Sequence, residues 1–192
     1  MQKKPFEKRL AGPNFELHQP TTSISRATEL YDILVRNDYF YPERLSFKSF
    51  KSPEDCMILF NKRLVEIRKG DSMYYDIVQE KDGGYVQVGE IYAKGIDRKN
   101  MAVNNIGYFV DIDKRGNGIA PGAVNLLTAK LFEMGFHRLC LYCEVSNHAS
   151  KKVAEKSQFE YEGTKRDFVY DPYAKKFWTV DMYAKLAKGN NL

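Results

Sequence analysis

The segment from residue 104 to residue 145 constrains the fold most, because it places strand-like stretches on both sides of one long helix. The apolar run NNIGYFVDI leads into a loop with two glycines, and a helical pattern then continues to Gly135. A second apolar run, HRLCLYCEV, follows. A strand, a helix and a strand connected in this order normally give two parallel, neighbouring strands. This segment therefore predicts an α/β core.

Helix and strand patterns alternate along the rest of the chain. Apolar residues at helical spacing predict helices at 25–38 and 53–69, and Ser52, Pro53 and Asp55 supply the start signals of the second one. Further elements are predicted as strands at 15–20, 73–79 and 85–94, a short helix at 146–158, and a closing hairpin at 159–171 and 175–186. The expected class is mixed α/β, with α+β character.

Length and composition bound the organisation of the chain. With 192 residues and 43% hydrophobic content, the sequence can bury one sizeable core, so we expect a single domain over residues 13–188. Before it, a mobile basic arm is predicted at residues 1–12, which contain Lys3, Lys4, Lys8 and Arg9. The net charge of +5 permits an anionic ligand or an acidic partner.

Several classes of protein are not expected. The sequence has no apolar run long enough to span a bilayer and no signal-like start, which predicts a cytoplasmic protein. A basic stripe interleaved with aromatic residues is not apparent, so direct nucleic-acid binding is not expected. Cys140 and Cys143 lie three apart on a predicted strand and point to opposite faces, which argues against a metal site. No sequence pattern separates a monomer from a homodimer.

The loop before the long helix, DIDKRGNGIAPGAV, has the character of an anion site. The first turn of a helix presents N–H groups without intrahelical partners, and the helix dipole adds positive potential there. Gly116 and Gly118 lack the side chains that would hold a phosphate away from the backbone, and Arg115 adds a charge at the rim. A simple tight turn is the alternative. A Walker loop would need Gly-Lys-Ser/Thr, and Pro121 replaces the third glycine of a dinucleotide-binding loop.

A family resemblance favours the anion site. Arg115, Gly118 and Ala120 match the R/Q-x-x-G-x-G/A motif of the GNAT acyltransferases. The stretches IGYFVDIDKRGNGIAPGAVNLL, FHRLCLYCEVSNHASKKVAEKSQFEYEG and TVDMYAKL resemble the RimJ/RimL branch, which acetylates the N-termini of ribosomal proteins. The similarity covers roughly Phe15 to Leu186. Gln158 stands where the family usually has a glycine, so a left-handed backbone is expected there.

The resemblance implies a splayed, mixed seven-stranded sheet flanked by about four helices, with acetyl-CoA between two diverging parallel strands. The residues that it implies for cofactor binding are Val110, Ile112, Arg115, Gly116, Asn117, Gly118, Ile119, Ala120, Asn147 and Ser150. A backbone amide between Phe109 and Ile112 would stabilise the oxyanion. Ser150 would also be catalytic, by protonating the departing thiolate.

The general base departs from the family pattern. In RimL-like proteins a glutamate follows the EG turn, and the same count in this chain leads to Val169, while Asn105 replaces another acidic residue. The candidates that remain are Glu90 and Asp111, with Asp167 and Glu144 also considered. At pH 7, freeing an α-amine of pKa near 8 costs about 1.4 kcal/mol, whereas a lysine or polyamine amine costs about 4.6 kcal/mol. A missing base therefore matters less for an N-terminal acetyltransferase.

Three functions are consistent with these observations. The first is an acetyl-CoA-dependent N-acetyltransferase acting by direct attack of a protein α-amine, with a ribosomal protein as the expected partner. The second is a small-molecule amine acetyltransferase acting on an aminoglycoside or a polyamine, which would need an acidic acceptor pocket. The third, suggested by Val169, is a noncatalytic acyl-CoA-binding module.

Overall fold

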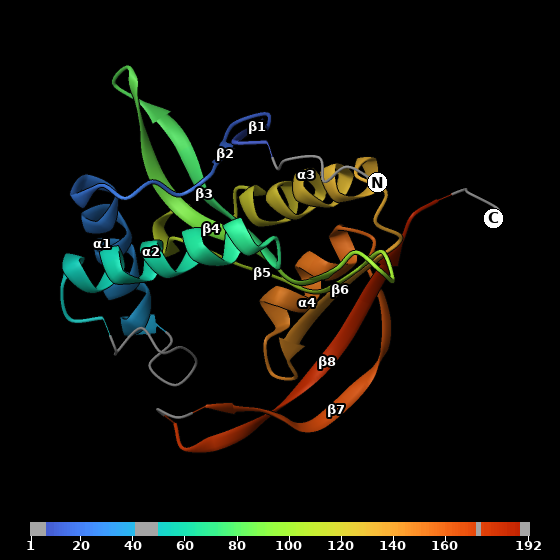
Figure 1. The fold of residues 1–192 in the computed structure, drawn as a ribbon. Coiled ribbons are helices and arrows are strands. Elements are labelled where there is room, and N and C mark those ends of the chain that lie inside the picture. Colours follow the sequence, from blue (N-terminus) through green and yellow to red (C-terminus); the bar gives the residue numbers. More distant parts are fainter. Residues whose placement is uncertain (1–6, 41–49, 172–173, 189–192) are drawn as a thin grey trace.

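The structure, a computed structural model, describes residues 7–40, 50–171 and 174–188 (Figure 1). Its elements in chain order are β1 (Arg9–Ala11), β2 (Glu16–His18), α1 (Ile24–Phe40), α2 (Pro53–Lys69), β3 (Ser72–Lys81), β4 (Gly84–Asp97), β5 (Ala102–Val110), α3 (Ile119–Glu133), β6 (Arg138–Glu144), α4 (His148–Lys156), β7 (Glu160–Asp171) and β8 (Lys176–Leu186). One helical turn, Ile112–Lys114, lies between β5 and α3. The predicted mixed class is confirmed.

One sheet contains all the strands that the structure describes, in the order β1-β2-β3-β4-β5-β6-β8-β7. Only the contact between β5 and β6 is parallel among the described strands, as expected for strands joined by the α3 crossover. The sheet has eight strands rather than the seven that the resemblance implied. The additional strand is β1, which pairs with β2 and buries Leu10. Arg9–Ala11 therefore belong to the sheet and not to the predicted arm, while residues 1–6 lie outside the described range.

The helices form two pairs. α1 and α2 pack on each other and over β3 and β4, whereas α3 and α4 pack near β5 and β6. Figure 1 shows the first pair on one side of the molecule and the second pair on the other. The larger apolar core lies between the sheet and α3, and a smaller one forms between α1 and α2. β5, β6, α3 and α4 therefore meet near the middle of the molecule (Figure 1).

Local sequence signals set the ends of two helices as predicted. At the start of α2, the Asp55 carboxylate accepts the Ser52 amide at 3.2 Å, which completes the capping box, and Gly70 ends the helix at φ 81°. After α4, Gln158 adopts φ 60°, which confirms the left-handed backbone expected where the family has a glycine.

The two parallel strands separate soon after they meet. β5 and β6 pair only through Ala102 with Arg138 and through Val103 with Leu139. Two residues later, the Asn105 side chain replaces a backbone partner and accepts the Tyr142 amide at 3.3 Å. On its other side β6 pairs with β8 along its whole length, from Arg138 to Glu144. The splay leaves an open space between the C-terminal halves of β5 and β6.

Candidate functional site

The glycine loop keeps its amide groups available to a ligand. Gly116 and Gly118 adopt φ angles of 80° and 74°, which glycine accepts without strain. A Cβ atom at either position would meet nothing within 4 Å, so the space beside the backbone is open. The amides of Gly116, Gly118, Ile119 and Ala120 donate to no carbonyl of the described chain. This set of unpaired donors at the N-terminus of α3 fits an anion site.

A cavity of about 530 Å³ opens beside this loop and reaches into the splay. Its walls come from β5, β6, the glycine loop, α4 and the β7–β8 hairpin. Of the residues predicted to bind cofactor, those that line it are Val110, Arg115, Gly116, Gly118, Ile119, Ala120, Asn147 and Ser150.

Two other predicted cofactor residues do not line the cavity. Ile112 lies in the helical turn before the loop. The Asn117 side chain instead donates to the carbonyls of Lys114 and Arg115, at 3.3 Å each. These two hydrogen bonds hold the loop together from within. The predicted cofactor residues that line the cavity therefore do not include Asn117.

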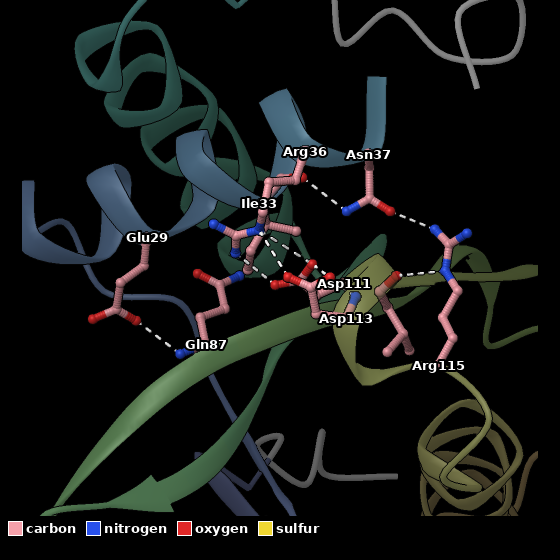
Figure 2. Close-up of polar contacts among 9 residues, drawn as sticks. Glu29, Ile33, Arg36, Asn37, Gln87, Asp111, Asp113 and Arg115 are labelled. Atoms are coloured by element: carbon pink, nitrogen blue, oxygen red, sulfur yellow. Dashed lines mark hydrogen bonds and ion pairs between the residues drawn. The ribbon is translucent and has the colours of Figure 1, made fainter. Parts of the chain in front are cut away.

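Arg115 fastens the loop to α1 (Figure 2). Its Nε donates to the Val110 carbonyl at 3.0 Å, and its Nη2 donates to the side-chain oxygen of Asn37. Asn37 is buried, and its amide nitrogen donates to the Ile33 carbonyl at 2.8 Å. The guanidinium of Arg115 therefore connects three segments of the chain, in addition to lining the cavity, where the sequence predicted only a charge at the rim.

Asp111 is engaged in a second link to α1. Its carboxylate is buried and accepts Arg36 Nη2 at 2.6 Å, and Arg36 also lies 3.8 Å from Asp113 (Figure 2). Asp111 does not line the cavity. Because the carboxylate is bonded to Arg36 of α1, this placement does not support the predicted role of Asp111 as a general base.

Glu90 also lies away from the cavity. It sits in β4, is 2% exposed, and forms an ion pair with Arg63 of α2. Burial raises the pKa of Glu90, while Arg63 opposes the shift. Its cross-strand partner in β3 is Asp76, which is equally buried. Glu90 therefore belongs to a buried charged cluster (Arg63, Asp76 and Glu90), and this placement does not support its predicted role as a base.

Ser150 reaches the cavity next to a tyrosine that the sequence did not single out. Its Oγ lies 3.0 Å from the Oη of Tyr108, and its amide donates to the Asn147 side chain at 3.1 Å. Burial raises the pKa of Tyr108 to about 12, although the bond to Ser150 opposes the shift. Tyr108 follows Gly107 in the IGY stretch of β5. Strand alternation could have placed it on the open face, but nothing in the sequence indicated Ser150 as its partner.

The end of β5 directs amide groups into the splay. The Asp111 amide donates to Val88 of β4 at 2.8 Å. Because amides alternate in direction along an antiparallel strand, those of Tyr108 and Val110 point the other way, towards β6. Within the predicted stretch from Phe109 to Ile112, Val110 is therefore the residue whose amide faces the gap.

One carboxylate among those considered lines the cavity, and it is Glu144. It accepts the Ser146 amide at 3.1 Å at the end of β6. Val169, the counted position of the family glutamate, also lines the cavity, after a break in the β7–β8 register between Lys165 and Val169. Asp167 lies within that irregular stretch and does not line the cavity.

Other chemistries find little support in the described residues. Cys143 lines the cavity, but burial raises the pKa of its thiol to about 11, which disfavours the nucleophilic thiolate. In the described ranges, no group of three or more His, Cys, Asp or Glu side chains could hold a metal ion. None of the described helices has the length and hydropathy needed to cross a membrane.

The residues present fit acetyl-CoA. The unpaired amides at Gly116 to Ala120 suit a pyrophosphate, and the edge of β5 offers donors to an extended, amide-bearing arm. The hydroxyl pair of Tyr108 and Ser150 lines the same cavity. Together these features form a continuous path from an anion site to a proton-donating group along one cavity.

Comparisons with known proteins point the same way. The family model described as acetyltransferase (GNAT) domain matches residues 26–160. RimL, a ribosomal L7/L12 alpha-N-protein acetyltransferase solved with coenzyme A, has a TM-score of 0.82 at 22% identity, over 95% of this chain and 99% of that one. The microcin C7 self-immunity acetyltransferase MccE, solved with acetyl-CoA and AMP, has a TM-score of 0.80 at 20% identity, over 91% and 93%.

A third solved structure is similar as well. The ribosomal-protein-S5-alanine acetyltransferase of Vibrio fischeri has a TM-score of 0.79 at 19% identity, over 95% of this chain and 98% of that one. No curated protein sequence matches the chain. At these identities the likeness to the solved structures concerns the fold.

Proposed function

Because the chain belongs to the GNAT acetyltransferase family, whose members use acetyl-CoA, we propose that it acetylates the N-terminal α-amine of a protein. A ribosomal protein is the partner that we favour. RimL and the Vibrio fischeri enzyme have the same fold, and each is named for the ribosomal protein that it acetylates. Such a partner would place the enzyme in the cytoplasm.

The composition of the cavity carries this proposal. Val169 provides no carboxylate at the counted base position, and the carboxylate that lines the cavity, Glu144, is already bonded to Ser146. From the residues that the structure describes, the acceptor would therefore receive little help in losing its proton. That loss costs about 1.4 kcal/mol for an α-amine at pH 7, against about 4.6 kcal/mol for a lysine-like amine. An α-amine is thus the acceptor that this site can use.

The chain's own groups supply the remaining catalysis. Acetyl-CoA provides an acetyl group activated as a thioester. The Val110 amide, which faces the splay, donates to the carbonyl oxygen as negative charge develops there. Ser150 Oγ donates a proton to the departing sulfur and takes one from Tyr108 Oη, which lies 3.0 Å away. No covalent intermediate on the enzyme is needed.

The charge of the cavity weighs against a polyamine or aminoglycoside acceptor. Its charged lining consists of Lys114, Arg115, Lys152, Lys156 and Glu144. Glu144 is the one carboxylate of this lining among the described residues, so a polycationic substrate would not find there the acidic acceptor pocket that it needs. The hydroxyl pair of Tyr108 and Ser150, in turn, favours a catalytic role over a noncatalytic acyl-CoA-binding module.

An acceptor panel tests the proposal. Release of CoA from acetyl-CoA is measured with peptides that begin with free serine, threonine or alanine and contain an internal lysine, and products are identified by mass spectrometry. Spermidine and an aminoglycoside complete the panel, with the same peptides N-terminally blocked as controls. We expect turnover only on free N-termini. Turnover confined to the small amines would overturn the proposal, and so would acetyl-CoA binding without any turnover.

A further inference from the structure

Two lysines of α4 that the proposed chemistry does not use also line the cavity. Lys152 and Lys156 are four residues apart and thus lie on one face of the helix. Both are exposed, and neither forms an ion pair or hydrogen bond with any residue that the structure describes. Like charges at this spacing disfavour a helix. The pair is therefore placed where an anionic ligand would relieve its repulsion.

The neighbouring lysine shows that this placement is not general to the helix. Lys151 does not line the cavity, and its ammonium lies 2.5 Å from the Asp181 carboxylate of β8. Lys152 and Lys156 instead line the cavity together with Ala149 and Val153, at helical spacing on the same side of α4. One side of α4 thus combines a small apolar stripe with two unpaired positive charges.

The proposed donor carries more negative charge than the glycine loop can bind. Coenzyme A contains a pyrophosphate and, separately, a phosphomonoester at the 3′ position of its ribose. The amides at the N-terminus of α3 suit one of these groups, and their influence fades beyond the first turn. The phosphomonoester carries up to two charges near neutral pH. A second cationic site in the same cavity would bind it.

We propose that Lys152 and Lys156 form a subsite for the 3′-phosphate of coenzyme A. The proposal rests on the proposed use of acetyl-CoA and assigns the two lysines a role in donor selection. Ammonium groups bind phosphate as mobile point charges, which suits a group near the mouth of a cavity. The enzyme then distinguishes coenzyme A from its 3′-dephospho form, while the rest of the donor site is unchanged.

Calorimetric titration with coenzyme A and with 3′-dephospho-coenzyme A tests the subsite. We expect the wild-type protein to bind coenzyme A about tenfold more tightly, as one or two charge-assisted hydrogen bonds would give. The Lys152→Gln/Lys156→Gln double variant should bind both ligands with the affinity that the wild type has for the dephospho form. Lys151→Gln, which makes the same change in charge per residue on the same helix, should keep the tenfold preference.

The possible results separate the two proposals. Equal binding of both ligands by the wild type, with turnover intact, would overturn the subsite and leave the acetyltransferase proposal standing. A double variant that retains the preference, or that loses affinity for both ligands equally, would also overturn the subsite. If the wild type binds neither ligand, both proposals fail.

Discussion

At the scale of single residues, Tyr108 and Ser150 define the reactive part of the cavity. Their oxygens lie 3.0 Å apart, one on β5 and the other on the first turn of α4, where the Asn147 side chain holds the Ser150 amide. Only the serine could be anticipated, from a motif that is local in sequence. The tyrosine lies 42 residues away, so the pair depends on how α4 packs against the splayed strand.

We predict that Ser150→Ala and Tyr108→Phe each lower kcat by about a hundredfold or more, as the loss of an acid catalyst would. The affinity for acetyl-CoA should change much less, because neither hydroxyl belongs to the glycine loop. Tyr161→Phe, which removes a hydroxyl bonded to Thr164 outside the cavity, is the matched control. Steady-state kinetics and calorimetry measure the two effects. A Ser150→Ala enzyme with the wild-type kcat would remove this serine from the mechanism.

A second residue-scale prediction concerns stability and not catalysis. Burial, reinforced by the Glu90 charge, raises the pKa of Asp76 to about 7, whereas the unfolded chain should titrate near 4. Between these values the folded state binds more protons than the unfolded state. The stability of the wild type should therefore fall as pH rises, by about 1.4 kcal/mol per pH unit from this residue alone.

Asp76→Asn should remove this dependence and keep an acceptor for the Gln87 side chain, which donates to Asp76 at 3.3 Å. Urea unfolding at pH 5 and pH 8 measures the effect. The variant should gain stability relative to the wild type at pH 8, and the gain should shrink at pH 5. A difference in stability that is the same at both pH values would show that Asp76 has no raised pKa.

At the scale of elements, α1 holds the cofactor loop in place. Asn37 and Arg36, one turn from the end of the described helix, bind Arg115 and Asp111 on either side of the loop (Figure 2). The same helix is fixed to β4 farther back, where the Glu29 carboxylate accepts the Gln87 amide at 2.8 Å. These contacts suggest that α1 orders the donor site although it contributes little to the cavity wall.

We expect Asn37→Ala to weaken acetyl-CoA binding by about 1 kcal/mol, or roughly fivefold, because Arg115 loses an acceptor that orients the loop. Glu29→Gln removes a charge from the same helix at the contact with β4 and should leave the affinity unchanged. Calorimetry on both variants, with thermal unfolding to monitor the fold, makes the comparison. Equal affinity in Asn37→Ala and the wild type would refute a role for α1 in ordering the loop.

Elements with local signals could be predicted from the sequence, and those set by distant contacts could not. α2 has its own caps, and α3 follows a glycine loop whose conformation depends on two residues, so both were found. β1 was missed because three residues, Arg9–Ala11, carry no strand pattern and become a strand only by pairing with β2. The ion pairs of Asp111 and Glu90 were equally invisible, since their arginines come from α1 and α2.

At the scale of the whole molecule, the account predicts a pH profile set by the acceptor. With no carboxylate at position 169, kcat/KM for a peptide α-amine should rise about tenfold per pH unit below pH ~8 and then level off, following the free amine. The same peptide blocked at its N-terminus should remain a poor substrate through its lysine. A plateau already reached near pH 6 would reveal a base in the enzyme and would contradict the assignment.

The central claim is that the glycine loop beside the splayed strands binds the acetyl donor, and calorimetric titration of acetyl-CoA into Gly118→Asp tests it most directly. Nothing lies within 4 Å of a Cβ atom at this position, and both Asp and Asn tolerate its positive φ, so Gly118→Asn controls for the added side chain. We predict that Gly118→Asp weakens binding by about 2–4 kcal/mol, or roughly thirtyfold to a thousandfold, and that Gly118→Asn weakens it far less. Unchanged affinity in Gly118→Asp would contradict the account.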